Sequence, residues 1–210
     1  MFLPYNLPDQ KLLQDHITPY GFCIWIPDQM YIVLGNSNSL QQSVHLAPIQ
    51  NDNVILMQRP TGGQTVFLSP QMVVVSAIHN TTQQASSKTY FAIYTHAIVK
   101  ALESFGIRNT QVQGISDITF NGRKIAGSAM YRNQKRVFFH AVLNVSENSE
   151  ILERYLLQPS TVPAYRQGRN HREFVTSLME QGFAISLDQM IAALEIQFQQ
   201  IPDQLHSKNS

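Results

Sequence analysis

A lysine and an aspartate stand on opposite strands of a hairpin that the sequence predicts. The hairpin reads SDITFNGRKIAGSAMYR, residues 116–132, and Asn121-Gly122 at its centre is the strongest short signal for a two-residue turn between strands. Such a turn aligns the residues on either side of it in a fixed register. The cross-strand pairs that it predicts are Phe120 with Arg123, Thr119 with Lys124, and Asp117 with Ala126.

Strand alternation then places the lysine and the aspartate on one face with small side chains around them. A solvated ion pair is the plain interpretation of this face, because surface lysines usually form nothing more. The run Gly127-Ser128-Ala129 favours a ligand instead, since small side chains leave room and an exposed strand need not be so bare. The residues predicted on this face are Asp117, Thr119, Lys124, Ala126 and Ser128, and those predicted to face the core are Ile118, Phe120 and Ile125.

A glycine pair, Gly62-Gly63, precedes a predicted strand within QRPTGGQTVFLSPQ, residues 58–71. Glycine adopts positive φ and lets a ligand approach the backbone, and exposed amides at such a bend can bind an anion. A plain bend between two strands is the alternative, and for an isolated glycine pair it is the commoner one. The P-loop and the dinucleotide-binding fingerprint are both absent from this stretch.

His140 lies in VFFHAVLNV, among apolar residues, where a histidine is more often a hydrogen-bonded core residue than a catalytic group. The face that it occupies depends on whether the preceding turn, residues 133–135, holds two residues or three. Cys23 lies in an apolar strand with no basic residue nearby, which is typical of a buried, unreactive thiol. The other histidines considered, His79, His96 and His171, show no metal-ligand spacing, so no structural metal is expected.

The composition is that of an ordinary globular protein, with 43% apolar and 14% charged residues among 210. A net charge of +1 creates no field that would gather nucleic acid, and a single cysteine fits a reducing cytosol. The sequence shows no secretory signal and no apolar run near the roughly 20 residues that cross a bilayer. We therefore expect a cytoplasmic protein without nucleic-acid or membrane partners. Residues 1–205 are expected to form one domain, followed by a disordered tail at 206–210 and no C-terminal accessory domain.

Strand patterns dominate the first part of the chain and helical patterns the last. An apolar stripe predicts one long helix over 87–105, and Ser186 with Gln189 forms a capping box before a helix over 187–200. Residues 36–50 are polar and irregular, which predicts a loop. We expect a mixed α/β fold of the α+β type, with largely antiparallel sheets and flanking helices. Strands are predicted over residues 20–27, 30–35, 53–59, 110–115, 117–120, 123–131 and 136–145, with one or two more within 64–79, and shorter helices are predicted over 149–157 and 172–181.

Four stretches, in order and with matching spacing over residues 20–178, resemble the lipoate–protein ligase family. RPTGGQTVF is similar to the family's R-x-x-GG-G-x-VF segment, and DITFNGRKIAGSA is similar to its N-D-I…K-I-x-G-S-A segment. FFHAVL resembles the H-H-G-x-L-L strand, and VPAYRQGRNHREFVTSL resembles the P-x-YR-x-x-R-x-H-x-x-F segment. The shared order of the four stretches makes the resemblance fairly specific.

The resemblance implies the biotin/lipoate ligase fold and an ATP- and magnesium-dependent acyl transfer. In that chemistry the carboxylate of lipoate or octanoate attacks the α-phosphate of ATP, and a lysine of an acceptor then attacks the acyl carbon. Charge develops on a phosphate and next on an acyl oxygen, which preorganised amides and one fixed cation stabilise. The implied acceptor is a lipoyl domain of a 2-oxoacid dehydrogenase subunit or the H protein of glycine cleavage.

The resemblance also implies roles for residues that match the family motifs. Lys124 matches the catalytic lysine that bridges the phosphate and the acyl carbonyl, and Asp117 matches an acidic residue that could bind magnesium. Gly62 and Gly63 match glycines that let the backbone meet the acyl-adenylate. The other residues implied at the substrate and nucleotide site are Arg59, Gln64, Thr65, Ile125, Gly127, Ser128, Ala129 and His140.

The chain departs from the family pattern where the family places contacts to phosphate. Gln64 replaces the third glycine, Gln58 replaces the first arginine of a tandem pair, and Ser69 replaces an acidic residue. We also expect the chain to lack the small C-terminal domain that many bacterial ligases have. In some relatives that domain is a separate chain needed for adenylation, so an accessory-domain protein is a further implied partner.

Three alternatives share the fold. GGQTVFLSPQ also resembles a segment of octanoyltransferases, but those enzymes use a cysteine downstream of the lysine, and Cys23 is the sole cysteine here. The departures on the phosphate side favour a non-catalytic homologue that binds lipoate or its adenylate. A biotin ligase is disfavoured because its G-R-G-R…W segment is absent.

Overall fold

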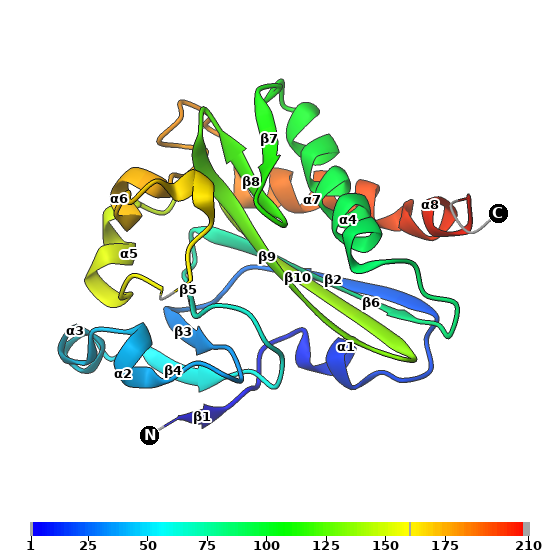
Figure 1. Ribbon diagram of the computed structural model, residues 1–210. Coiled ribbons are helices and arrows are strands. Elements are labelled where there is room, and N and C mark those ends of the chain that lie inside the picture. The colour runs from blue at the N-terminus through cyan, green and yellow to red at the C-terminus, as the bar shows by residue number, and fades with distance from the viewer. Residues whose placement is uncertain (1, 160, 208–210) are drawn as a thin grey trace.

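Two β-sheets form the framework of the protein, and the computed structural model describes residues 2–159 and 161–207 (Figure 1). The larger sheet has six antiparallel strands in the order β2-β6-β10-β9-β8-β7. The neighbouring strands β10 and β6 pair from Arg136 opposite Asn80 to Asn144 opposite Met72. The strands are β2 (Tyr20–Trp25), β6 (Met72–Asn80), β7 (Thr110–Gln113), β8 (Asp117–Phe120), β9 (Arg123–Asn133) and β10 (Arg136–Asn144).

The smaller sheet has four strands in the order β1-β4-β3-β5 and packs against one face of the larger sheet. Both β1 and β3 run parallel to β4, whereas β5 runs antiparallel to β3. Trp25 and Val74 of the larger sheet pack with Val33 of the smaller one, so the two sheets share an apolar cluster. The strands are β1 (Leu3–Pro4), β3 (Tyr31–Leu34), β4 (Ile55–Gln58) and β5 (Val66–Leu68).

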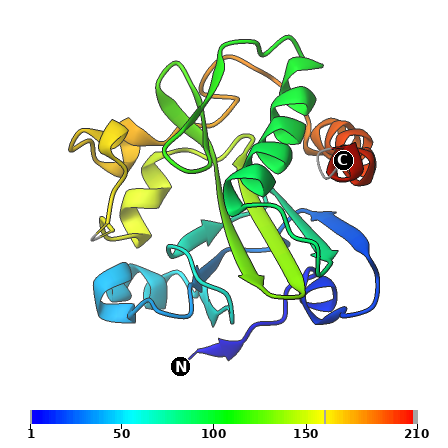
Figure 2. The same ribbon diagram turned by 45° about the vertical axis from the view of Figure 1, so that its right-hand side comes forward.

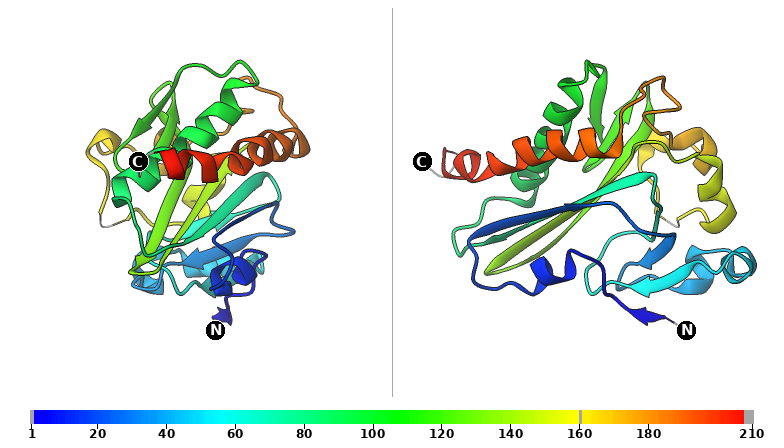
Figure 3. Two further views of the ribbon diagram at one scale, coloured as in Figure 1. Left: turned by 90° about the vertical axis from the view of Figure 1, so that its right-hand side faces the viewer. Right: turned by 180° about the vertical axis from the view of Figure 1, so that it is seen from behind.

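Three helices cover the opposite face of the larger sheet, namely α4 (Ser87–Glu103), α7 (Leu187–Gln199) and α8 (Ile201–Ser207) (Figures 2 and 3). The apolar stripe predicted on α4 packs onto alternate residues of β10. Tyr94 of α4 stacks on Phe139 of β10 with ring centroids 4.5 Å apart. Burial of these aliphatic and aromatic side chains supplies the main favourable term in folding.

Shorter helices flank the smaller sheet and the adjoining end of the larger sheet. In Figure 1, α2 and α3 lie beside β4, and α5 and α6 lie above them. None of the described helices is both long and apolar enough to span a membrane. The short elements are α1 (Gln10–Gln14), α2 (Leu40–Ser43), α3 (Leu46–Asn51), α5 (Glu150–Tyr155), the 3₁₀ turn η1 (Ala164–Arg166) and α6 (His171–Phe174).

The predicted fold class is confirmed, as are the predicted strands, the long helix α4 and the capping box of Ser186 and Gln189. The loop predicted over 36–50 is wrong, because it contains α2 and α3, which are too short to show a helical period. The helix predicted over 172–181 is too long, because α6 ends at Phe174 and Val175 is extended. The tail predicted to be disordered begins at residue 206, and residues 206 and 207 form the end of α8. The buried Leu205 anchors this helix, and residues 208–210 lie outside the described residues.

Candidate functional site

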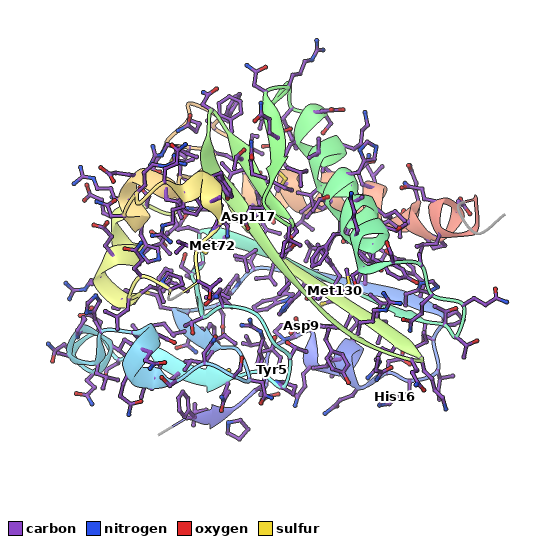
Figure 4. All side chains as sticks on the ribbon, in the orientation of Figure 1. Tyr5, Asp9, His16, Met72, Asp117 and Met130 are labelled. Carbon is purple, nitrogen blue, oxygen red and sulfur yellow. The ribbon has the colours of Figure 1, made fainter. Side chains whose placement is uncertain are left out.

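A cavity of about 310 Å³ lies between the two sheets and is bordered by residues that follow α5. This volume falls in the range of small-molecule sites. In Figure 4, Asp117 and Met72 mark one part of the cavity, and Asp9 and Tyr5 mark another part. Gly62 is not among the lining residues, and neither is its neighbour Gly63. The predicted site residues that line the cavity are Arg59, Gln64, Thr65, Asp117, Lys124, Ile125, Gly127, Ser128, Ala129 and His140.

Lys124 is fixed at this cavity by a carboxylate. Its Nζ lies 2.7 Å from Oδ1 of Asp117, and both side chains are mostly buried. The other carboxylate oxygen, Oδ2, accepts a hydrogen bond of 2.7 Å from the hydroxyl of Tyr165. The carbonyl oxygen of Lys124 accepts a bond of 2.9 Å from the amide of Thr176. The ammonium group is thus oriented from both its side chain and its backbone.

A β-bulge in β9 changes which residues accompany the lysine. Ile118 pairs with Ala126, so the predicted pairing of Asp117 with Ala126 is wrong. Ile125 and Ala126 both enter the core beneath the helices, and a Cβ on Gly127 would lie 2.6 Å from Lys124 Nζ. Gly127 therefore shares the face of the lysine.

The face predicted for Ala126 and Ser128 is wrong for the same reason. Ser128 lies opposite Ala141, a residue buried beneath the helices, and directly opposed residues share a face of the sheet. Extra residues in a bulge reverse the alternation beyond it, which the sequence pattern did not reveal. Ile118, Phe120 and Ile125 do face the core as predicted.

Arg59 organises the loop that contains the glycine pair, residues 59–65, which we call the glycine loop. Arg59 is buried, with Nε and Nη2 donating to the carbonyl of Gly62 at 3.1 and 2.8 Å. Nη2 also donates to the carbonyl of Gln64 at 2.8 Å, and Nη1 donates to that of Val33 at 3.2 Å. Burial lowers the pKa of Arg59 to about 10, so the side chain stays charged at neutral pH. The guanidinium therefore serves mainly to hold the backbone of this loop.

Gly63 is the member of the pair that needs to be glycine. Its φ is +98°, and a Cβ there would lie 2.8 Å from Arg59 Nη2 and 2.9 Å from the Cβ of Ala129. A Cβ on Gly35 would lie 2.0 Å from the carbonyl oxygen of Gly63. Gly62, in contrast, has no atom within 4 Å of the position that its Cβ would take. Close backbone packing thus explains Gly63, and the exposed Gly62 is left with an open side.

Thr65 and Gln64 of the glycine loop line the cavity, whereas two of the three residues that depart from the family pattern do not. Thr65 donates through Oγ1 to Oδ1 of Asn38 at 3.2 Å. Gln64 is exposed and lines the cavity. Gln58 and the buried Ser69 do not line it, so Gln64 is the one substitution of the three that borders the cavity.

His140 faces the cavity from the middle of the larger sheet. The turn before β10 leaves two residues unpaired, which sets His140 opposite Ala129 on one side and Ser76 on the other. Burial, and then the positive charge of Arg59, lower the pKa of His140 to about 3. The imidazole is therefore neutral at pH 7.

A buried carboxylate that sequence reasoning missed lines another part of the cavity. Asp9 accepts hydrogen bonds from the hydroxyls of Tyr5, at 2.6 Å, and Ser76, at 2.7 Å. Burial raises its pKa above the usual range. Its position before a short helix near the N-terminus gives no sequence signal of burial.

The residues that follow α5 form a further wall, which we call the C-terminal segment, residues 161–176. Arg166 and His171 line the cavity from this segment, and neither was assigned a role from the sequence. Burial, and then the nearby charge of Arg166, lower the pKa of His171 to about 4. The signal that could have found these residues was the YRQGRNH part of the fourth family stretch.

The arrangement suits chemistry in which charge develops on oxygen beside an apolar group. A fixed ammonium stabilises such charge, and the cavity beside it has mainly aliphatic and aromatic walls from β5 and β6. Within residues 2–159 and 161–207, no group of three or more histidine, cysteine or acidic side chains could hold a metal ion by itself. A metal at Asp117 would thus need ligands from a substrate.

Residues 6–199 match the family model described as the lipoyl protein ligase A/B catalytic domain. The lipoate-protein ligase LplJ of Bacillus subtilis (strain 168) is 24% identical over 139 residues, which cover 66% of this chain and 41% of that protein. The chain spans 41%, 37% and 42% of the length of three curated relatives that it matches, and 57% of the length of a fourth, from Bdellovibrio bacteriovorus.

Two solved structures illustrate the shared fold. Lipoate-protein ligase A bound with ATP has a TM-score of 0.75 and 19% identity, and the match covers 90% of this chain and 74% of that one. A bipartite lipoate protein ligase of Thermoplasma acidophilum, studied with its E2 lipoyl domain, has a TM-score of 0.75 and 18% identity. That match covers 88% of this chain and 71% of the archaeal one. At such identities, the likeness establishes the fold.

Proposed function

Because the chain belongs to the lipoyl protein ligase A/B catalytic domain family, we propose that it is a lipoate–protein ligase. It activates lipoate or octanoate with ATP and transfers the acyl group to a lysine of an acceptor lipoyl domain in the cytoplasm. The observation that carries this proposal is the ammonium of Lys124, held 2.7 Å from Asp117 beside an apolar cavity. An acyl chain would fill the cavity while its carboxylate lies at the lysine.

The proposed reaction has two steps. The acyl carboxylate attacks the α-phosphorus of ATP, which forms the acyl-adenylate and releases pyrophosphate. The deprotonated amine of the acceptor lysine then attacks the acyl carbon, forming an amide and releasing AMP. Lys124 stabilises the negative charge on the phosphate in the first step and on the acyl oxygen in the second.

The glycines and the glycine loop around Lys124 supply room and position. Gly127 leaves space for the ammonium of Lys124, and Gly62, which lies outside the lining of the cavity, has no atom within 4 Å of the position that its Cβ would take. Arg59 supports these groups by holding the glycine loop. The other residues proposed to contact the acyl-adenylate are Gly63, Gln64, Thr65, Ile125, Ser128, Ala129 and His140.

Magnesium accompanies ATP in this proposal, with Asp117 as its protein ligand. Magnesium is commonly bound by one or two carboxylates together with substrate phosphates, so a single carboxylate at the site fits this role. Both oxygens of Asp117 already accept bonds, from Lys124 and Tyr165. A carboxylate has about four lone-pair sites, so Asp117 would hold the ion and keep both contacts.

The proposed partners are an acceptor and an accessory chain. The acceptor is a lipoyl domain of a 2-oxoacid dehydrogenase subunit or the H protein of glycine cleavage. The archaeal relative, which is bipartite and was studied with its E2 lipoyl domain, supports both kinds of partner.

Intact-mass analysis of an apo lipoyl domain tests the proposal. The domain is incubated with the protein, lipoate, ATP and magnesium, and it should gain one lipoyl group. Lys124→Ala should lower the rate of this gain by about 10²- to 10³-fold, the usual effect of removing a group that stabilises a developing oxyanion. Lys100→Ala is the matched control, because Lys100 also lies 2.7 Å from a carboxylate, that of Glu103, but on α4. Equal rates for the two variants would contradict the assignment of Lys124.

Synthetic lipoyl-adenylate separates the two steps. Transfer from the adenylate without transfer from ATP would indicate that adenylation needs the accessory chain. Binding of lipoate or its adenylate without any transfer would favour a non-catalytic homologue. Acylation of Cys23 by an octanoyl-carrier protein would favour an octanoyltransferase, although burial raises the pKa of this thiol and it does not line the cavity.

A further inference from the structure

Arg166 is a buried arginine of the cavity wall whose guanidinium is held on one side only. It is 3% exposed and lines the cavity together with Lys124 and His171. Its Nε donates to the carbonyl of Arg169 at 2.8 Å, and its guanidinium carbon lies 4.8 Å from the centre of the Phe174 ring. Its Nη2 is buried and has no hydrogen-bond partner in the described part of the chain.

A neighbouring arginine shows the contrast. Arg169 also lies over the ring of Phe174, with its guanidinium carbon 5.3 Å from the ring centre. Its Nη2, Nε and Nη1 donate to the carbonyls of Tyr165, Arg166 and Gly122 at 2.8, 3.0 and 2.9 Å. Each nitrogen of Arg169 thus has a backbone partner, which marks it as structural, whereas Arg166 retains a donor without one.

Arg166 interacts electrostatically with Glu153, but among the described residues its charge is not met by a carboxylate in ion-pair contact. Across residues 2–159 and 161–207, no ion pair joins it to a carboxylate, while Lys124 is paired with Asp117. The adjacent His171 is neutral at pH 7, because burial and then Arg166 lower its pKa to about 4. A buried cation with an unmet N–H group is unfavourable, and an oxyanion would remove both penalties.

We infer that Arg166 binds an oxygen of the nucleotide phosphate in the same cavity as Lys124. This inference rests on the proposed function, which brings a phosphate to the cavity. A guanidinium presents paired N–H donors that match the oxygens of a phosphate, so the free side of Arg166 suits this group. Arg166 is then a nucleotide-binding residue, and Lys124 acts on the reacting phosphate and acyl groups.

Isothermal titration with AMP and with adenosine isolates the contact to phosphate. The wild-type protein should bind AMP more tightly than adenosine. Arg166→Gln should weaken AMP binding by about 10- to 100-fold, the range for a hydrogen bond to a charged group, and leave adenosine binding unchanged. The control is Arg172→Gln, which removes the same charge from an arginine side chain that is 63% exposed and paired with Glu150. This control should bind both ligands as the wild-type protein does.

Unchanged AMP affinity in Arg166→Gln would overturn the inference. Equal loss of AMP and adenosine binding, together with a lower Tm, would also overturn it, because Arg166 would then hold the segment and not the phosphate. Should Arg166→Gln not fold, Arg166→Met is measured in the same way, since it keeps an apolar stem against Phe174. For this variant too, either unchanged AMP affinity or an equal loss of AMP and adenosine binding with a lower Tm would overturn the inference.

Titration with inorganic pyrophosphate distinguishes failure of the inference from failure of the proposed function. Wild-type binding of pyrophosphate without binding of AMP would contradict adenylation. Loss of that pyrophosphate binding in Arg166→Gln would still support an oxyanion contact at Arg166. If Arg166→Gln weakens no phosphate probe, the inference is wrong.

Discussion

Two walls of the cavity each contribute an arginine and a histidine, and they differ in how their arginines are satisfied. On the sheet side, Arg59 donates to three backbone carbonyls of the glycine loop and β3, next to His140. On the side of the C-terminal segment, Arg166 makes one hydrogen bond through Nε, next to His171. On the sheet side, the hydrogen bonds of Arg59 form within the protein and need no ligand. This suits the preorganisation that catalysis requires. On the side of the C-terminal segment, Nη2 of Arg166 has no hydrogen-bond partner among the described residues, and a ligand would supply one.

The first prediction concerns stability and has the largest expected effect. Arg59→Met removes the donors to the carbonyls of Gly62, Gln64 and Val33, and should lower the free energy of unfolding by about 3 kcal/mol. Arg166→Met removes one such bond and should cost about 1 kcal/mol. Urea unfolding monitored by circular dichroism measures both values. Equal losses would remove the proposed difference between the walls.

The second prediction concerns the position of the lysine on the sheet side. A Cβ on Gly127 would lie 2.6 Å from Cε and Nζ of Lys124, so Gly127→Ala should displace the ammonium. The rate of acyl transfer should fall by about 10- to 100-fold, equivalent to about 1.4 to 2.7 kcal/mol. In Lys124→Ala, adding Gly127→Ala should have no further effect, because both changes act on one group. Additive losses would show that Gly127 acts independently of the lysine.

The third prediction uses the pH dependence of stability. Burial lowers the pKa of His140 from 6.5 to about 3, so the unfolded chain binds an additional proton at intermediate pH. Stability from this group is complete above pH 6.5 and is lost as the pH falls toward 3. His140→Gln should therefore lose about 2 kcal/mol less than the wild-type protein between pH 7 and pH 4.5. Urea unfolding at the two pH values tests this, with the exposed His96→Gln as control.

The fourth prediction has the smallest effect and concerns the C-terminal segment. Tyr165→Phe removes the 2.7 Å bond to Asp117 and should lower the free energy of unfolding by about 1 kcal/mol. The rate of acyl transfer should fall by a few-fold, because Asp117 still holds Lys124 but with less restraint. Tyr131→Phe removes the hydroxyl of a tyrosine that is 36% exposed and should leave the rate unchanged. If Tyr165→Phe transferred the acyl group at the wild-type rate, Tyr165 would not help to position Lys124.

The sequence predicted features that depend on local pattern. The two-residue turn at Asn121 set Thr119 opposite Lys124, and the alternation of β8 correctly put Ile118 in the core. The capping box at Ser186 was confirmed because its bonds join residues close in sequence. Local rules failed at the bulge, because the entry of both Ile125 and Ala126 into the core depends on the helices that cover them.

The division of labour between the two arginines could not be predicted from the sequence. Both lie in stretches that match family motifs, and both are equally basic. Arg59 is distinguished by the carbonyls that the glycine loop presents to it, and Arg166 by a Phe174 ring that is close in space as well as in sequence. The burial of Asp9 likewise depends on Ser76, a residue of β6 that lies far along the chain.

The bulge in β9 has a consequence for chain length. Lys124 and Gly127 face the cavity, and the two residues between them face the core. Loss of one of these two residues would restore simple alternation and keep every later side chain of β9 on its present face. A deletion beyond the bulge, at Ala129 for example, would instead move each remaining side chain of the strand to the opposite face of the sheet. Natural or engineered length variants of this strand should therefore be tolerated at residues 125–126 sooner than at residues 128–132.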